Sequence, residues 1–449
     1  MKQRKYYLGL VLLLALVLGF VGAYLGVQLG QAKYQAESPL PIDMTQQSDE
    51  SSDRSIDFGK VIQTFNIIKE HYIEDVDDET LLEGAIQGML STLEDPYSSY
   101  MDIEQMERFN EQIEASFEGI GAEVSMVNGR VTIVAPIKDS PAEAAGLRPN
   151  DQVLKIDGED IEGWDLNEAV SKIRGEKGTE VTLEIYRPGV EQPFEVSIIR
   201  DKIPLETVHS ELRTVDGKKT GIIKITTFSE TTAADFTEQL TQLESEGIEG
   251  LVIDVRGNPG GLLQSVEDIL EHFIPNHMPY YQIEGKDGEK IPYYSKLDQK
   301  KDYPISILID EGSASASEIL SVALKDMGYD VVGTKSFGKG TVQQAIPLGD
   351  RSTVKLTLYK WLSPKGHWIH ETGVEPTIEQ RQPDFYYTHP IQIEEPLAFD
   401  QASNMIRNAQ IMLQGLGYKD VRVDGYFDRE TEATVKDFQQ KHGLNVTGE

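Results

Sequence analysis

The sequence predicts a multidomain protein of mixed α/β and α+β class. Three observations support this prediction: an apolar run opens the chain, strand-like alternation fills two separate stretches, and helical periodicity marks the regions that flank them. With 449 residues and 39% hydrophobic content, the chain is large enough for two to four domains, each with its own core.

The composition excludes several classes of protein. The chain has no cysteine, so disulfides, thiol catalysis and cysteine-ligated zinc are excluded. Its formal net charge of -33 argues against binding to nucleic acid, which requires a basic surface. His367 and His370 are three residues apart, but they lie in a segment that predicts a turn and a strand rather than a helical metal site. We therefore expect no metal and no cofactor.

Residues 1–32 carry the pattern of a membrane anchor. Basic residues at positions 2, 4 and 5 precede an apolar run over residues 6–29, long enough to cross a hydrocarbon layer of about 30 Å. Positive charge before the run predicts a cytoplasmic N-terminus and an extracytoplasmic body. A cleaved signal peptide is the alternative, because residues 29–32 could serve a signal peptidase. Residues 33–57 are polar and acidic, which predicts a disordered linker.

The stretch from Glu311 to Gln344 contains the residues best suited to catalysis. Ser315 and Glu318 have the spacing of a capping box, so Ser315 is expected at a helix N-terminus, where backbone N–H groups can stabilise an oxyanion. Lys339 lies between two glycines, where a substrate can come close. To act as a base it must be buried, because a solvated lysine has a pKa of about 10.4. From the local pattern alone, a helix cap and a surface lysine are the alternatives.

The sequence SASASEI followed by SFGKGTVQQ resembles the serine–lysine centre of the carboxy-terminal processing peptidases, also called tail-specific proteases. The resemblance extends from about residue 57 to residue 379. It implies that Ser315 is the nucleophile, that Lys339 is its general base and that Gln343 orients the lysine. A serine–lysine pair is a known variant of the serine–histidine–aspartate triad and needs no catalytic histidine.

Residues 199–385 are expected to form the α/β peptidase core. Strand patterns are predicted at residues 220–225, 250–255, 305–309, 330–333 and 354–359. The turn RGNPGG follows the second of these strands, and the resemblance implies that it faces the nucleophile. One oxyanion N–H would then come from Gly260 or Gly261, which the sequence does not separate, and the other from Ala316. Asp254 and Arg256 are expected to be structural.

Residues 104–198 resemble a PDZ domain of the protease-associated type, a small β-sandwich or barrel, with GLRPNDQVLKIDG as a specific signal. The implied chemistry is strand addition, in which the loop Gly119-Ile120-Gly121 offers N–H groups to the terminal carboxylate of a peptide. Arg174 matches a family position proposed to link PDZ occupancy to the peptidase. A surface arginine at a helix end is the local alternative.

The remaining segments are helical. Residues 58–103 resemble the N-terminal helical region of the family, which takes part in dimerisation in some members; a simple helical cap is the alternative. After a linker at 386–404, residues 405–449 resemble the small helical peptidoglycan-binding module of cell-wall enzymes. Two departures stand out: Asp428 replaces the glycine of the DGxFG pattern, and the given sequence ends at residue 449, where the resemblance leads us to expect a last helix. A plain three-helix interaction domain is the alternative.

These features predict a membrane-anchored, extracytoplasmic serine endopeptidase that recognises the C-terminal tails of exported proteins through its PDZ domain. If the N-terminus is cleaved, the protein would be secreted or associated with the cell wall. We expect protein substrates, a membrane contact through the N-terminal helix, peptidoglycan and a homodimer as partners, and no nucleic acid. Two alternatives are a non-catalytic PDZ and cell-wall scaffold on a degenerate peptidase fold, and a serine hydrolase that uses His370.

Overall fold

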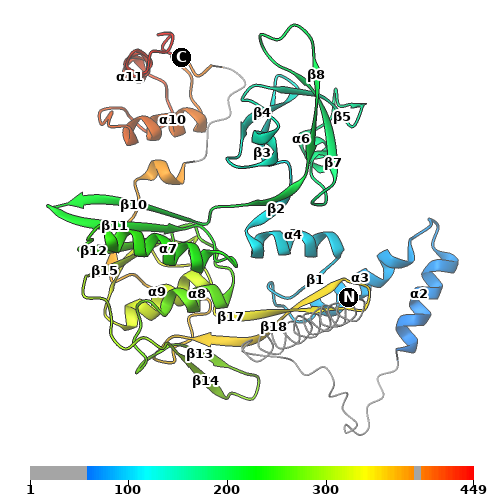
Figure 1. Cartoon of the computed structure of the whole chain (residues 1–449), viewed down its shortest axis with the longest axis vertical. Helices are drawn as coiled ribbons and strands as arrows, with labels where there is room; N and C mark the ends of the chain where they lie inside the picture. Colours follow the sequence, from blue (N-terminus) through cyan, green and yellow to red (C-terminus); the bar gives the residue numbers. More distant parts are fainter. Residues whose placement is uncertain (1–57, 389–395) are drawn as a thin grey trace, which may run out of the picture. The chain divides into compact units, whose positions relative to one another are not determined.

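The computed structural model describes residues 58–388 and 396–449 (Figure 1). The chain divides into two compact units, residues 1–81 and residues 82–449. The predicted anchor (1–32) and the predicted linker (33–57) lie outside the described residues. Within the described ranges, no helix has both the length and the apolar character that crossing a membrane requires.

The predicted helical region forms two helices with no buried residue, α2 (Gly59–His71) and α3 (Asp78–Ser91). A turn follows α3 and leads into a short strand that the sequence did not predict, β1 (Ser99–Met101). The next helix, α4 (Ile103–Glu114), begins at a capping box, in which Asp102 accepts a hydrogen bond from the backbone of Gln105.

The PDZ region contains a six-stranded sheet and two helices. Its strands are β3 (Ala122–Val127), β4 (Arg130–Pro136), β5 (Gln152–Ile156), β6 (Glu159–Asp160), β7 (Glu180–Tyr186) and β8 (Phe194–Ile199). The helices are α5 (Pro141–Ala144) and α6 (Leu166–Ile173). A separate two-stranded ladder joins β2 (Ser116–Gly119) to β9 (Asp201–Pro204). Ile133, Leu183 and Ile185 are fully buried in the core between these elements.

The main sheet of the predicted peptidase core has the order β10-β11-β12-β15-β16-β19. Its strands are β10 (Val208–Val215), β11 (Lys218–Ile225), β12 (Gly250–Asp254), β15 (Ile305–Ile309), β16 (Asp330–Gly333) and β19 (Ile378–Glu379). All neighbours pair in parallel except the β10–β11 hairpin. The predicted strands of this sheet are therefore confirmed, and their continuous apolar runs are typical of parallel strands covered on both faces.

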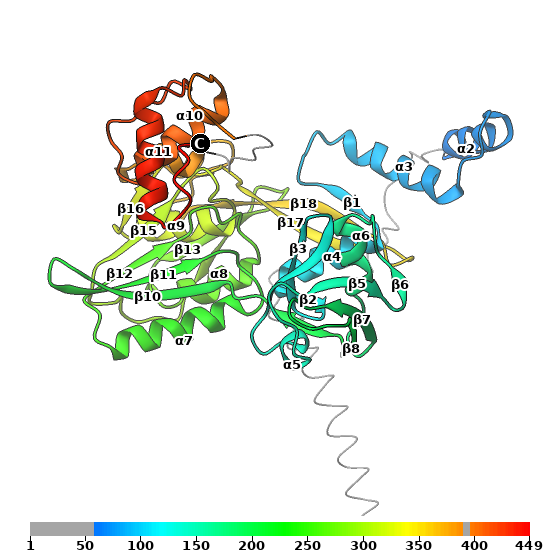
Figure 2. The same ribbon diagram turned by 90° about the horizontal axis from the view of Figure 1, so that it is seen from above.

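Helices α7 (Thr232–Ser245), α8 (Leu263–Leu270) and α9 (Ala316–Asp326) accompany this sheet, with α7 packed on β10 and β11 and α9 on β15 and β16 (Figure 2). Strands β12 and β15 are parallel neighbours, so the turns that follow them leave the same edge of the sheet. One of these turns is RGNPGG and the other leads to Ser315. Ligands of open α/β sheets bind at such carboxyl edges.

A second sheet carries the lysine segment. It consists of β13 (Pro279–Glu284), β14 (Lys290–Tyr294), β17 (Thr341–Pro347), β18 (Thr353–Leu362) and β1. Strand β1 pairs with β18, so the segment that follows the N-terminal helices is part of this sheet. The predicted strand within residues 363–370 is wrong. That segment is a turn, closed by hydrogen bonds between Ser363 and His367 and between Gly366 and Ser363.

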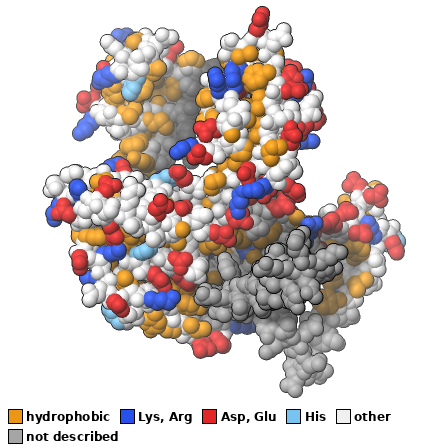
Figure 3. All heavy atoms as spheres, viewed as in Figure 1, with side chains coloured by type: hydrophobic (Ala, Val, Ile, Leu, Met, Phe, Trp, Pro, Cys, Tyr) orange, Lys and Arg blue, Asp and Glu red, His pale blue; other side chains and the backbone are white. Residues whose placement is uncertain are grey.

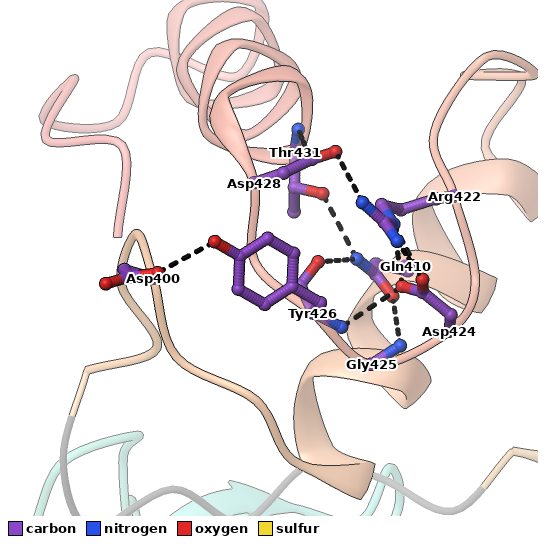
Figure 4. A network of polar contacts seen from close by, with 8 residues as sticks. All are labelled: Asp400, Gln410, Arg422, Asp424, Gly425, Tyr426, Asp428 and Thr431. Atoms are coloured by element: carbon purple, nitrogen blue, oxygen red, sulfur yellow. Dashed lines mark hydrogen bonds and ion pairs between the residues drawn. The ribbon is translucent and has the colours of Figure 1, made fainter.

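The C-terminal region contains a short 3-10 helix, η1 (Asp384–Tyr387), and two α-helices, α10 (Asn404–Gly415) and α11 (Arg429–Lys441). Its centre is the fully buried amide of Gln410, whose Nε2 donates to Tyr426 O and Thr431 Oγ1 and whose Oε1 accepts from Gly425 N (Figure 4). Asp428, which departs from the family pattern, is the N-cap of α11 and accepts from Thr431 N at 2.8 Å.

Acidic side chains are scattered among basic and uncharged ones over the face of the described residues shown in Figure 3. This distribution accords with the net charge of -33.

Candidate active site

Ser315 lies at the N-terminus of α9, where the chain arrives from β15. Its φ of 54° and ψ of -113° are unusual for a residue with a side chain, and such strain persists only where the surrounding structure enforces it. Its hydroxyl lies in a capping box with the backbone of Glu318, and no other side chain in the described part of the chain forms a hydrogen bond with it. The serine is therefore held in a strained turn with its oxygen unblocked by other side chains.

The hydroxyls of the two neighbouring serines, unlike that of Ser315, are used in hydrogen bonds to backbone carbonyls. Ser313 Oγ donates to Val255 O at 2.7 Å, and Ser317 Oγ donates to Asn258 O at 2.9 Å. Both are fully buried. These two hydroxyls tie the SASAS segment to Val255, directly before the RGNPGG turn, and to Asn258 within it, while the hydroxyl of the middle serine makes no such bond.

The structure separates the two glycines that the sequence left open. A Cβ at position 260 would lie 2.8 Å from Ser315 Cβ and 3.0 Å from Ala316 N, so Gly260 gives the nucleophile its space. The Gly260 N–H, however, already donates to Asn258 Oδ1 at 2.8 Å. The amides of Gly261 and Ala316 have no hydrogen-bond partner among the described residues. This arrangement favours Gly261 over Gly260 as an oxyanion donor, and the oxyanion role itself stays a prediction.

Lys339 meets the main requirement for a general base. Burial lowers its pKa below the ordinary value of 10.5, and the charge of Lys355 acts in the same direction, while Asp95 and Glu318 oppose it. Within the described ranges its Nζ forms no hydrogen bond or ion pair, and it lies 4.9 Å from the centroid of the Tyr97 ring. An amine without a carboxylate partner is easier to deprotonate.

No hydrogen bond joins Ser315 Oγ to Lys339 Nζ in the part of the chain that the structure describes. Catalytic hydrogen bonds are often long in the absence of substrate and tighten when it binds. The dyad therefore requires a closer approach of the two side chains during the reaction, and the pairing of these residues stays a prediction.

Glu318 was not among the predicted site residues, yet it connects the two predicted catalytic segments. It is fully buried, and its Oε2 accepts hydrogen bonds from Ser315 N at 2.9 Å and Lys339 N at 2.8 Å. Its Oε1 accepts from Ser336 Oγ at 2.6 Å and Gly338 N at 2.7 Å. The Glu318 carboxylate therefore holds the turn at Ser315 against residues 336–340, which we call the lysine loop.

Gln343 lies on β17, with its amide nitrogen bound to neighbouring hydroxyls. Nε2 donates to Thr341 Oγ1 at 2.9 Å and to Thr357 Oγ1 at 3.0 Å. Its Oε1 has no partner among the described residues. A lysine amine needs an acceptor to be oriented, and this oxygen is the group that remains for that purpose. The orienting role of Gln343 stays a prediction.

His370 holds the lysine loop rather than the nucleophile. Its Nδ1 accepts a hydrogen bond from Gly340 N at 3.2 Å, and its ring stacks on Trp368 with centroids 5.0 Å apart. The indoles of Trp361 and Trp368 donate to the carbonyls of Lys339 and Gly340 at 2.9 and 2.7 Å. No hydrogen bond links His370 to Ser315 within the described ranges.

The predicted peptide-binding residues form a second group, in the PDZ region. Gly119 ends β2, and the N–H groups of Ile120 and Gly121 have no partner in the described structure, as a carboxylate-binding loop requires. Arg174 is the C-cap residue of α6. Its guanidinium lies 3.0 Å from Glu111 Oε2 and 4.8 Å from the centroid of the Phe117 ring.

Asp254 and Arg256, at the carboxyl end of β12, form a bidentate ion pair with hydrogen bonds of 2.8 and 2.6 Å. The pair explains the raised pKa of Arg256, since the carboxylate stabilises the charged guanidinium. Its geometry agrees with the structural role expected for both residues.

Family models match four parts of the chain. The model of peptidase family S41 matches residues 219–380, and that of a PDZ domain matches residues 132–187. The model described as "Activating protease CtpB N-terminal domain" matches residues 16–105. The model described as "Putative peptidoglycan binding domain" matches residues 402–449.

Individual relatives give the same picture. Carboxy-terminal processing protease CtpB of Bacillus subtilis (strain 168) is 53% identical over 405 residues, which are 90% of this chain and 84% of that protein. Carboxy-terminal processing protease CtpA of the same organism is 43% identical over 87% of this chain and 83% of its own length. Among solved structures, a photosystem II D1 C-terminal processing protease is 25% identical with a TM-score of 0.44, over 72% of this chain and 87% of that one. On the identity and coverage of the two Bacillus relatives, the chain belongs to the carboxy-terminal processing proteases, which are serine peptidases of family S41 that carry a PDZ domain.

Proposed function

We propose that this protease is a membrane-anchored, extracytoplasmic endopeptidase that binds the C-terminal tails of exported proteins and cleaves them with a Ser315–Lys339 dyad. The observation that carries the proposal is the combination of a serine hydroxyl without a side-chain partner, in a strained turn at a helix N-terminus, with a lysine whose pKa is lowered by burial. Glu318 bonds to the backbone of both residues, which supports their acting together.

In the proposed reaction, neutral Lys339 removes the proton of Ser315 Oγ as this oxygen attacks the scissile carbonyl. The carbonyl oxygen becomes negatively charged, and the N–H groups of Ala316 and Gly261 donate hydrogen bonds to it. The lysine then gives the proton to the leaving amine as the C–N bond breaks, which releases the C-terminal product and leaves the acyl group on Ser315 Oγ. A water molecule, deprotonated by Lys339, hydrolyses this ester and restores the serine. Gln343 Oε1 accepts a hydrogen bond from the amine and keeps its lone pair directed at the serine.

The test is the degradation of an unfolded protein with a free C-terminal tail by the detergent-solubilised full chain, beside its Ser315→Ala variant. We expect cleavage by the parent and none by the variant, because the alanine has no nucleophile. Equal cleavage by both proteins would refute the assignment of Ser315. The variant also controls for contaminating proteases.

We further propose that Arg174 couples tail binding to cleavage. Glu111 and Phe117 hold its guanidinium in the structure, so an incoming carboxylate would have to compete with Glu111 for it. We expect the parent to cleave a substrate with a free tail roughly tenfold faster than one with an amidated tail, the effect of one charged hydrogen bond. Arg174→Ala should reduce this ratio to about one.

The control for this prediction is Lys172→Ala, which removes a neighbouring positive charge from the same helix. It should keep the ratio of the parent. Gating through Arg174 would be wrong if the Arg174→Ala variant still preferred the free tail to the same degree.

The proposed anchor rests on the apolar run over residues 6–29 and the basic residues before it. We expect the protein to stay with washed membranes at high salt and to leave them only with detergent. Release by salt would instead indicate a cleaved signal peptide, and a secreted or wall-associated protease.

We also propose that the N-terminal helices mediate homodimerisation. Phe58, Val61, Ile62 and Ile67 each expose between 50% and 60% of their surface, and neither α2 nor α3 buries a residue. Exposed apolar side chains in this number mark an interaction surface. Light scattering should find a dimer for the parent and a monomer for Ile62→Glu, and a monomeric parent would exclude this role.

The C-terminal region is proposed to bind peptidoglycan, on the strength of its family match and its ordered centre around Gln410. We expect the full chain to sediment with purified cell walls and a chain truncated after residue 396 to remain in the supernatant. Equal sedimentation of both would leave the region as an interaction domain without affinity for the wall.

A further inference from the structure

A segment outside the matched S41 region reaches the catalytic lysine. The turn after α3 contains Asp95 and Tyr97, more than two hundred residues before Lys339 in the chain. Among the described residues, the ring of Tyr97 is the only aromatic face that the Lys339 Nζ lies over, at 4.9 Å from the ring centroid. The sequence indicated only a turn here, because nothing local points to a contact with a distant lysine.

The turn is held in place by its own hydrogen bonds and by β18. Asp95 accepts from Tyr97 N at 3.0 Å and from Ser98 Oγ at 2.6 Å. Ser98 Oγ in turn accepts from Thr357 N at 3.0 Å, and β1 pairs with β18 directly after the turn. The same Thr357 receives a hydrogen bond from Gln343 through its hydroxyl. The ring is therefore placed by backbone that also places the predicted orienting glutamine.

We propose that Tyr97 is a positioning residue for the general base, whose ring fixes the place of the Lys339 amine and sets its protonation. This inference rests on the proposed dyad. The ring acts in two opposite ways: its apolar bulk excludes water from the amine, which favours the neutral form, and its π face attracts the ammonium, which favours the charged form.

The other groups around the amine are accounted for. Lys355 on β18 favours the neutral form, and Asp95 and Glu318 favour the charged form. The rings of His370 and Tyr97 form a T-shaped contact, with centroids 6.1 Å apart. Burial and nearby carboxylates, including Glu371, raise the pKa of the Tyr97 phenol, so it stays neutral at the pH of the reaction. Substitutions that change the Tyr97 ring therefore test its effect on the Lys339 amine.

Three substitutions in the full chain separate the two effects. Tyr97→Phe keeps the ring and should leave the acid limb of kcat/KM where the parent has it. Tyr97→Leu still shields the amine from water with an apolar side chain but removes the π face that attracts the ammonium. The acid limb of the kcat/KM profile should therefore move to lower pH by about half a pH unit. Tyr97→Ala admits water to the amine, so the limb should move to higher pH.

A second readout does not depend on activity. In a Ser315→Ala background, the rate at which an amine-reactive reagent modifies Lys339, followed by mass spectrometry against pH, reports the titration of the amine directly. We expect the Lys339 amine to titrate at the same pH in the Tyr97→Phe variant and in the parent. It should titrate at lower pH in Tyr97→Leu and at higher pH in Tyr97→Ala. If leucine and alanine variants titrate with the parent, the inference is overturned.

The outcomes also distinguish this inference from the dyad. If Lys339→Ala cleaves like the parent, the dyad is wrong, while the titration of the amine still decides the role of Tyr97. If Tyr97→Ala does not fold, the comparison of leucine with phenylalanine decides alone, and coincident titration curves refute the proposal.

Discussion

Replacement of Lys339 by methionine is expected to abolish peptidase activity without lowering the stability of the protein. The dyad loses its base, so kcat/KM should fall by about 10³-fold or more. Methionine fills a similar volume and needs no solvation, so the unfavourable burial of an amine disappears. A dead enzyme that unfolds no more easily than its parent would show that the lysine serves catalysis rather than folding.

Lys339→Met should also change how the stability of the protein depends on pH. Burial lowers the pKa of Lys339 in the folded state below 10.5, so the unfolded chain binds the additional proton between the two values. Stability of the parent should therefore rise with pH across that window, and activity should be lost as the pH falls through the lowered pKa. Lys339→Met should lack this part of the stability profile.

Kinetics over a range of pH measure kcat/KM, and urea unfolding over the same range measures the free energy of unfolding. Ser315→Ala is the matched control, and the double variant should be no less active than either single one, because residues that act as a unit are not additive. Activity of Lys339→Met within tenfold of the parent would contradict the dyad.

The second large effect is expected for Glu318→Gln, which should be both less stable and less active than the parent. The amide presents two N–H donors where the carboxylate now accepts hydrogen bonds from Ser315 and Lys339 or from Ser336 and Gly338. Two hydrogen bonds to a charged acceptor are lost, a destabilisation on the order of 3 kcal/mol. Because both catalytic segments lose their common tie, kcat/KM should fall by about 10²-fold even where the protein remains folded.

Thermal unfolding and kinetics well below the melting temperature test this expectation. Glu311→Gln is the control, since Glu311 is exposed and makes a single side-chain hydrogen bond with Thr334. It should change the free energy of unfolding by less than about 0.5 kcal/mol and leave kcat/KM intact. Parent-like stability and activity of Glu318→Gln would mean that the carboxylate does not hold the site together.

The elements of the main peptidase sheet were largely predictable because their signals are local. The runs at 250–255 and 305–309 are apolar on both faces, as buried parallel strands are, and the structure has β12 and β15 there. The segment at 363–370 was predicted as turn and strand, but its backbone hydrogen bonds close a turn. Trp368 and His370 alternate with other residues as in a strand, yet they instead form hydrogen bonds with the backbone of Gly340.

The site was predictable to the extent that its residues lie in compact motifs. Ser315, Lys339 and Gln343 stand in recognisable sequences, whereas Glu318 appeared in the same motif only as a capping residue. Its second pair of hydrogen bonds, to residues 336 and 338, depends on how α9 and the lysine loop meet. The sequence could not decide whether Gly260 or Gly261 is the better oxyanion donor. That choice depends on the hydrogen bond from Gly260 N to the Asn258 side chain.

The amino-acid sequence alone indicated the family and the order of the regions, and it predicted Ser315 as nucleophile and Lys339 as base, because motif spacing and hydrophobic periodicity are properties of neighbouring residues. Only the tertiary structure decided which groups surround that base. Tyr97 reaches Lys339 from the turn before β1, and Glu318 reaches it from α9. Both contacts join segments distant in sequence, and the burial that lowers the lysine pKa is the sum of such contacts. Solvation of an amine depends on everything packed around it, which no local pattern records.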